Sequence, residues 1–157
     1  MSYGSDQRTS EVIEAVLAER PDLATYLSEA HEAAWRAVDP VLLELCRLRV
    51  AMLLGCEAEQ QERTEAARAA GLDETTIAEL AKWPTSPRFG SRERACLAFC
   101  EQFVIDVANM PDELALAVSA ELGPDGLRTF VIAVLVLEQR QRLRLAWEAI
   151  FGPPVAA

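Results

Sequence analysis

The feature that most constrains this chain is the segment Asp39–Gly55, an apolar run between strong helix-boundary signals. Asp39-Pro40 is typical of a helix start, because aspartate caps free N–H groups and proline fits the first turn. The residues from Pro40 to Leu54 are apolar on most sides of the predicted helix, and Gly55 interrupts it. A helix without a wide polar face is normally buried on most sides. The segment therefore predicts a helical domain packed around this one element.

The rest of the chain shows helical spacing and no pattern of strands. Hydrophobic residues make up 51% of the sequence but aromatic residues only 6%, and much of the apolar share is alanine, the best helix former. We predict an all-α bundle of seven to eight helices, which begin near Ser10, Pro21, Pro40, Cys56, Asp73, Ser91, Asp112 and Leu127. The helix from Cys56 is expected to run to Ala70. Residues 1–9 are expected to be a disordered tail, and residues 10–152 one domain.

The charge balance and the length of the apolar runs exclude several kinds of partner. With 15 basic and 25 acidic residues the net charge is −10, which repels phosphate backbones and argues against nucleic acid. The segment Met1–Thr9 lacks the apolar core of a signal peptide, and the longest apolar run, Phe130–Leu137, is too short to span a bilayer. We therefore expect a cytoplasmic protein without a membrane partner, and its four cysteines as thiols.

A family resemblance appears in the sequence from Glu44 to Cys56. It reads Glu-Leu-Cys-Arg-Leu-Arg-Val-Ala-Met-Leu-Leu-Gly-Cys. This stretch, with the Ala-Arg-Ala-Ala-Gly-Leu ending at Leu72, resembles the alkylhydroperoxidase D (AhpD)-like and carboxymuconolactone decarboxylase family. In the redox branch of that family a glutamate precedes a CxxCxxxH motif by twelve residues. The resemblance implies an all-α AhpD-like bundle, homo-oligomers (trimers or hexamers) and an activity that is either that of a peroxidase (peroxiredoxin), in the redox branch, or that of a decarboxylase.

The motif is only half present. Glu44 and Cys56 match the family's glutamate and first cysteine, whereas Glu59 stands at the second cysteine and Arg63 at the histidine. On one continuous helix, Cys56, Glu59 and Arg63 would form a single stripe. A cysteine in a first helical turn is favoured as thiolate, and the second cysteine resolves it as a disulfide. Without that cysteine and the histidine, a CxxC peroxidase cycle cannot run.

Three interpretations of Cys56, Glu44, Glu59 and Arg63 remain open. They are a buried ion-pair network without chemistry, a site that binds a small anionic molecule, and an active enzyme. In the second, Arg63, with Arg47 or Arg49, would hold the anion, since arginine grips carboxylates and does not move protons. In the third, the protein would be a single-cysteine peroxidase with an external thiol reductant, or a cofactor-free lyase or isomerase that uses Glu44 and Glu59.

Other candidate residues are interpreted as structural. His31, the only histidine, is expected at the surface or in packing, and one histidine cannot supply a di-iron site. Cys96 and Cys100 share a helix face without further ligands, so we expect core packing instead of zinc. None of the residues Cys46, Cys96 and Cys100 occupies the position of the second cysteine in the family motif. The arginines at 140, 142 and 144 are expected in ion pairs inside the protein or at a subunit contact. No cofactor or metal is expected.

Overall fold

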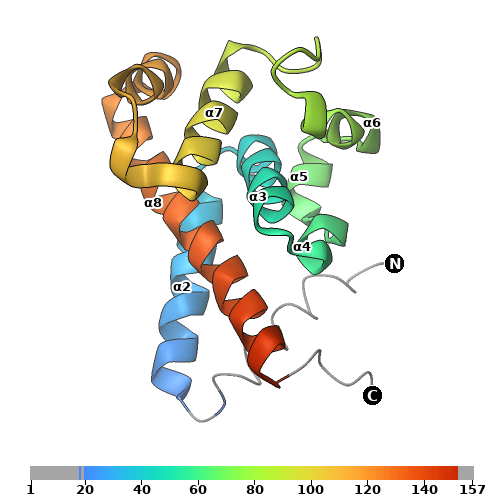
Figure 1. The fold of residues 1–157 in the computed structure, drawn as a ribbon, viewed down its shortest axis with the longest axis vertical. Helices are drawn as coiled ribbons and strands as arrows, with labels where there is room; N and C mark the ends of the chain where they lie inside the picture. Colours follow the sequence, from blue (N-terminus) through green and yellow to red (C-terminus); the bar gives the residue numbers. More distant parts are fainter. Residues whose placement is uncertain (1–17, 19, 152–157) are drawn as a thin grey trace.

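The computed structural model describes residue 18 and residues 20–151, and in these residues it is helical without strands, as predicted (Figure 1). Its elements are α2 (Pro21–Ala37), α3 (Pro40–Leu54), α4 (Glu57–Gln61), α5 (Glu65–Ala69), α6 (Glu74–Ala78), η1 (Leu80–Lys82), α7 (Ser91–Asp106), η2 (Val107–Asn109) and α8 (Asp112–Phe151). The predicted tail over residues 1–9 and the predicted helix near Ser10 lie outside the described residues.

Helix α3 is the centre of the bundle, as its apolar sequence predicts. Nine of its 15 residues are buried, and it contacts α4, α5, α7 and α8. The carboxylate of Asp39 accepts a hydrogen bond from the backbone N–H of Leu42 at 2.9 Å, which caps the first turn. Gly55 ends the helix with φ of 70°, a left-handed conformation that glycine adopts readily. Both boundaries are therefore encoded locally in the sequence.

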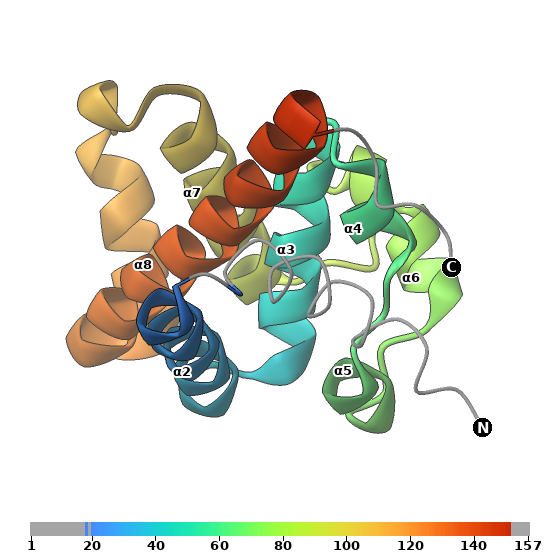
Figure 2. The ribbon, with the colours of Figure 1, turned by 90° about the horizontal axis from the view of Figure 1, so that it is seen from below.

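Helices α2, α7 and α8 cover the other sides of α3. Seen from below, α2 and α8 lie side by side on one side of α3, while α4, α5 and α6 lie on the other (Figure 2). The main core joins leucines of α3 to side chains of α7 and α8, with Phe130 completely buried. The two helices predicted on either side of residues 123–126 are both present within α8, which is interrupted at Gly123, where φ is 78° and ψ is 166°.

The prediction of one helix from Cys56 to Ala70 is wrong. The structure has two short helices, α4 and α5, separated by extended backbone at Glu62 with ψ of 150°. The carbonyl oxygens of Glu59 and Glu62 accept hydrogen bonds from the Arg47 side chain, and the N–H of Thr64 donates to Glu44. The buried side chains of Glu44 and Arg47 thus form hydrogen bonds with backbone groups of residues 59–64. In a continuous helix these backbone groups would be hydrogen-bonded within the helix.

No helix within residues 20–151 combines the length and the apolar character needed to cross a membrane. Several large apolar side chains are nevertheless exposed. Two of them, Ile132 and Leu135, lie on α8 with 63% and 47% of their surface accessible, and Leu116 near the start of the same helix is 67% exposed. The other described residues leave these three side chains largely uncovered.

Candidate functional site

A buried cluster of charges joins α3 to α4. Glu44 and Arg47 lie one turn apart on α3, and Glu59 lies on α4; their side chains are 1%, 5% and 3% exposed. Ionised groups at this depth are strongly destabilising unless opposite charges and hydrogen bonds compensate them. The cluster therefore has to be judged by its hydrogen bonds, which determine what remains free for chemistry.

All five N–H groups of the Arg47 guanidinium donate to oxygen atoms of the protein. Two of these bonds reach the carboxylate oxygens of Glu44, at 2.8 and 2.9 Å. Two more reach the carboxylate and the backbone carbonyl of Glu59, at 2.7 and 2.8 Å, and the last reaches the carbonyl of Glu62 at 2.8 Å. Burial works to lower the pKa of Arg47, but the bonds and charges of Glu44 and Glu59 outweigh burial and raise it. Arg47 is thus a permanent cation with no donor left for a ligand.

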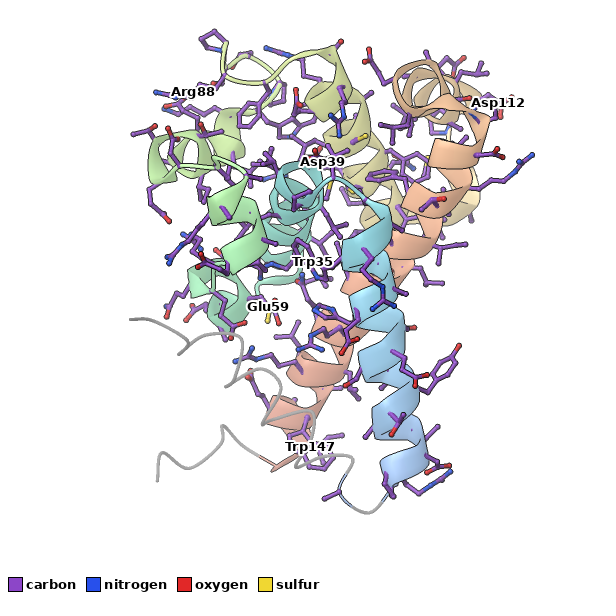
Figure 3. All side chains as sticks on the ribbon, turned by 180° about the vertical axis from the view of Figure 1, so that it is seen from behind. Trp35, Asp39, Glu59, Arg88, Asp112 and Trp147 are labelled. Atoms are coloured by element: carbon purple, nitrogen blue, oxygen red, sulfur yellow. The ribbon has the colours of Figure 1, made fainter. Side chains whose placement is uncertain are left out.

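The C-terminal half of α8 closes the cluster on its other side. Arg144 lies 3.5 Å from the second carboxylate oxygen of Glu59, 3.1 Å from the carboxylate of Glu62 and 3.2 Å from that of Glu148. The side-chain amide of Gln141 donates to the backbone carbonyl of Arg47 at 3.0 Å. Figure 3 shows Glu59 on the α4 segment, seen from the side opposite to that of Figure 1 (Figure 3). The sequence-based expectation that the late arginines form ion pairs inside the protein is met by Arg144.

Cys56 lies at the N-cap of α4 and is only 1% exposed. Burial raises the pKa of the Cys56 thiol; a backbone N–H from Glu59 and the charge of Arg144 lower it, whereas the charge of Glu59 raises it, and the net effect is upward. A thiol with a raised pKa is mostly protonated at neutral pH and is a poor nucleophile. Burial thus outweighs the influences that favour the Cys56 thiolate.

The other three cysteines lie together elsewhere. Cys46, Cys96 and Cys100 are completely buried in the main core between α3 and α7, as expected for Cys96 and Cys100, and no described cysteine forms a disulfide. Cys46 is ten positions before Cys56, a separation of about 15 Å along a helix, whereas disulfides need Cα atoms within roughly 7 Å. The neighbouring Cys100 thiol and burial raise the pKa of Cys46 well above its ordinary value. This group therefore offers Cys56 no resolving partner.

Arg63 does not join Cys56 and Glu59 in the stripe that a continuous helix would produce. It lies in the break between α4 and α5, and its guanidinium pairs with Glu74 at 2.9 Å. Another of its nitrogens donates to the backbone carbonyls of Gln60 and Glu62. Arg49 likewise pairs with Glu101 at 2.6 Å. The structure thus joins Glu44 to Glu59 through Arg47, and directs Arg63 and Arg49 to other carboxylates.

The structure adds one residue that the sequence interpretation assigned to surface or packing. His31 on α2 lines a small hollow, partly open to solvent, together with Arg47, Glu59 and Thr64. Its Nδ1 atom is buried without a hydrogen-bond partner in the structure, and so are Oε1 of Glu59 and Oγ1 of Thr64. Burial and then the charges of Arg140 and Arg47 lower the pKa of His31 to about 3, so the imidazole is neutral at pH 7.

A sequence signal for His31 did exist. The histidine is four positions after Leu27 and three before Ala34, so all three lie on one face of α2. Ala34 is buried against α3 and α8 in the second apolar cluster, and Leu27 lines the hollow next to His31. A histidine on the apolar face of a helix points toward the bundle interior. Only the fold, however, brings α2 to the segment that contains Glu59.

No group of three or more His, Cys, Asp and Glu side chains within the described part of the chain is arranged to hold a metal ion. The ionisable groups near Cys56 are instead paired with arginines. Three buried atoms of the cluster, on Glu59, His31 and Thr64, have no hydrogen-bond partner, although the one on Glu59 lies 3.5 Å from the Arg144 guanidinium.

Comparison with known proteins places these observations in a family. The sequence profile of the carboxymuconolactone decarboxylase family matches residues 21–102, just over half of the chain. Two uncharacterised proteins of Mycobacterium tuberculosis, from strains CDC 1551 and H37Rv, are 31% identical to it over 93 residues. That match covers 59% of this chain but 33% of each relative, so the chain spans about a third of the length of the curated relatives it matches.

A crystal structure shares the fold. It belongs to an Agrobacterium tumefaciens protein of unknown function, described as a candidate antioxidant defence protein AhpD. The two structures superpose with a TM-score of 0.73, and the match covers 85% of this chain and 93% of the other. The sequences are 18% identical, so the likeness concerns the fold alone.

Proposed function

The chain belongs to the carboxymuconolactone decarboxylase family, and from this premise we propose that it is a member without efficient cysteine peroxidase activity, which binds a small molecule beside Glu59. One observation carries the proposal: Arg47 holds Glu59, the residue at the resolving-cysteine position, in a buried ion pair of 2.7 Å. A carboxylate in that place cannot form a disulfide with Cys56, and its charge opposes a Cys56 thiolate.

The same contacts argue against the two enzymatic alternatives. A single-cysteine peroxidase needs an accessible thiolate, whereas Cys56 is 1% exposed and its pKa is raised. A lyase or isomerase that uses Glu44 and Glu59 needs carboxylates free to exchange protons. Both oxygens of Glu44 accept bonds from Arg47, and one of them also accepts from Thr64. Acid–base chemistry would therefore depend on the second carboxylate oxygen of Glu59, which accepts no hydrogen bond but lies 3.5 Å from Arg144, and substitution Glu59→Gln would abolish it.

We expect iodoacetamide to alkylate Cys56 in the folded protein at least about tenfold more slowly at pH 7 than an exposed thiol, because only thiolate reacts. Mass spectrometry of peptides quenched over time measures the rate for each cysteine. The same peptide from protein unfolded in guanidinium chloride is the control, and it should react as an ordinary thiol. Rapid and selective alkylation of Cys56 would instead indicate an activated thiolate.

Peroxide consumption with a dithiol reductant tests the function itself. We expect wild-type protein and Cys56→Ser to consume hydrogen peroxide at the same low rate as the reductant alone. Turnover of about 1 s⁻¹ or more that disappears in Cys56→Ser would contradict the proposal, since that is the range of ordinary enzymes.

We also expect a homo-oligomer in the cytoplasm, a trimer or a hexamer. This expectation rests on the family resemblance and on the exposed apolar side chains Ile132, Leu135 and Leu116 of α8, which a second copy could cover. Light scattering coupled to size-exclusion chromatography should give a mass of three or six times 17.3 kDa. A mass of one subunit at micromolar concentration would contradict it.

A further inference from the structure

An exposed stripe runs along the second half of α8, after the interruption at Gly123. Ile132 and Leu135 lie at its centre, with 63% and 47% of their surface accessible. Asp125 and Arg142 lie at its ends, and their side chains are 96% and 55% exposed. Spacings of three and seven positions are those of the a and d positions of a coiled coil, the face that one helix presents to another. We call these four positions the α8 stripe.

The α8 stripe is complementary to itself when two copies are antiparallel. If Ile132 lies opposite Leu135 of a second copy, then seven positions further out Asp125 lies opposite Arg142 of the second copy. A two-fold axis repeats both contacts, which gives an apolar centre with an acid–base pair at each end. A parallel arrangement would instead place Asp125 against Asp125 and Arg142 against Arg142. The order of the charges therefore favours the antiparallel one.

The charges on and beside the stripe also allow two copies to approach there. The whole chain has a net charge of −10, so two copies repel each other on average. Along the stripe, however, Asp125 pairs with Arg128 at 2.6 Å and Glu138 pairs with Arg142 at 2.8 Å, so acids and bases balance. Exposed pairs within one helix contribute little to stability. Asp125 and Arg142 are therefore able to pair with a second copy at little cost.

We propose that the second half of α8 pairs antiparallel with the same segment of a second copy of the chain through the α8 stripe, Ile132 against Leu135 and Asp125 against Arg142. The stripe extends about 26 Å along the helix, and at the usual crossing angle of about 20° two helices stay close over that length. The inference rests on the proposed homo-oligomer and names one of its contacts. A trimer has no two-fold axis, so of the two expected assemblies it selects the hexamer.

An exchange of the two end charges tests the contact and its register, with sedimentation equilibrium of the full chain at low salt as the measurement. Asp125→Arg places like charges at both ends of the paired stripes and should weaken the association of the two copies at least about 30-fold. Arg142→Asp should have the same effect for the same reason. The double variant Asp125→Arg/Arg142→Asp exchanges the charges and should restore the wild-type affinity to within about threefold.

A second variant tests the apolar centre. Ile132→Glu places a carboxylate against Leu135 of the second copy and should weaken the association at least about 100-fold. Because the side chain of Ile132 is largely exposed within one subunit, the variant should keep the helical circular dichroism of the wild type. The control is Arg36→Asp, which removes an exposed ion pair to Glu32 on α2, away from the stripe, and should leave the association unchanged.

Each contrary outcome has a definite meaning. A wild-type mass of one subunit overturns the homo-oligomer and the contact together, whereas a mass of three subunits overturns the contact alone. An association that Ile132→Glu leaves intact overturns the contact as well. A double charge variant that associates no more tightly than Asp125→Arg overturns the antiparallel register. The proposal that peroxidase activity is absent fails separately, through turnover that depends on Cys56.

Discussion

Replacing Arg47 with methionine is expected to lower the free energy of unfolding by about 3–5 kcal/mol, the range for breaking a buried ion pair by removing one partner. The substitution leaves the carboxylates of Glu44 and Glu59 in the interior, each with about 1–3% of its surface exposed. It also removes the donors to the carbonyl groups of Glu59 and Glu62. Urea unfolding followed by circular dichroism at 222 nm measures the loss.

Two companion variants separate the cause from a general effect of losing an arginine. Arg142 pairs with Glu138 one turn away, and its side chain is 55% exposed. Arg142→Met should therefore cost only about 0–1 kcal/mol. Adding Glu44→Gln and Glu59→Gln to Arg47→Met should restore part of the lost stability, because neutral amides do not leave an uncompensated charge. Equal losses in Arg47→Met and Arg142→Met would show that the cluster is not the buried ion-pair network described above.

The second large effect concerns pH. His31 has a pKa of about 3 in the folded protein against an ordinary value of 6.5, so between these values the unfolded chain binds the extra proton. Stability must therefore fall as the pH is lowered from 6.5 toward 3. The difference amounts to about 3 kcal/mol between pH 7 and pH 4. The variant His31→Phe, which cannot titrate, should lack this part of the acid destabilisation.

Other charged groups surround His31, and the comparison with the variant removes their contribution. Those that line the same hollow are Arg47 from α3, Glu59 from α4, Glu62 and Arg63 from the following break, and Arg140 from α8. Because these groups remain in His31→Phe, subtracting its stability curve from that of the wild type isolates the imidazole. Parallel curves from pH 7 to pH 4 would mean that His31 is not held neutral by its surroundings.

Local signals in the sequence were enough to predict most of the fold. Asp39, Pro40 and Gly55 set the boundaries of α3 through hydrogen bonds and backbone conformations that involve neighbouring residues only. The absence of a polar face on α3 predicted its central burial, and nine buried residues confirm it. The all-α class and the family followed from these features and from the motif around Cys56.

The candidate site was predictable only in part. The sequence places Glu44, Cys56 and Glu59 near one another through the spacing of two consecutive helices, and the structure links Glu44 to Glu59 through Arg47. Arg63 was misplaced because helical spacing assumes that the helix continues. The assumption failed because the backbone carbonyls of Glu59 and Glu62 accept hydrogen bonds from Arg47, three positions after Glu44, and the helix is broken there.

There is a physical reason why the sequence predicted some of these features and only the tertiary structure decided the others. Helix caps, apolar periodicity and the loss of the second motif cysteine are properties of residues close in the chain, so the sequence states them directly. The partners of a buried charge are chosen by packing, because a guanidinium with five donors uses whichever oxygen atoms the fold brings within reach. Tertiary structure alone therefore decided that Arg47 and not Arg63 holds Glu59, and that His31 from α2 faces the same hollow.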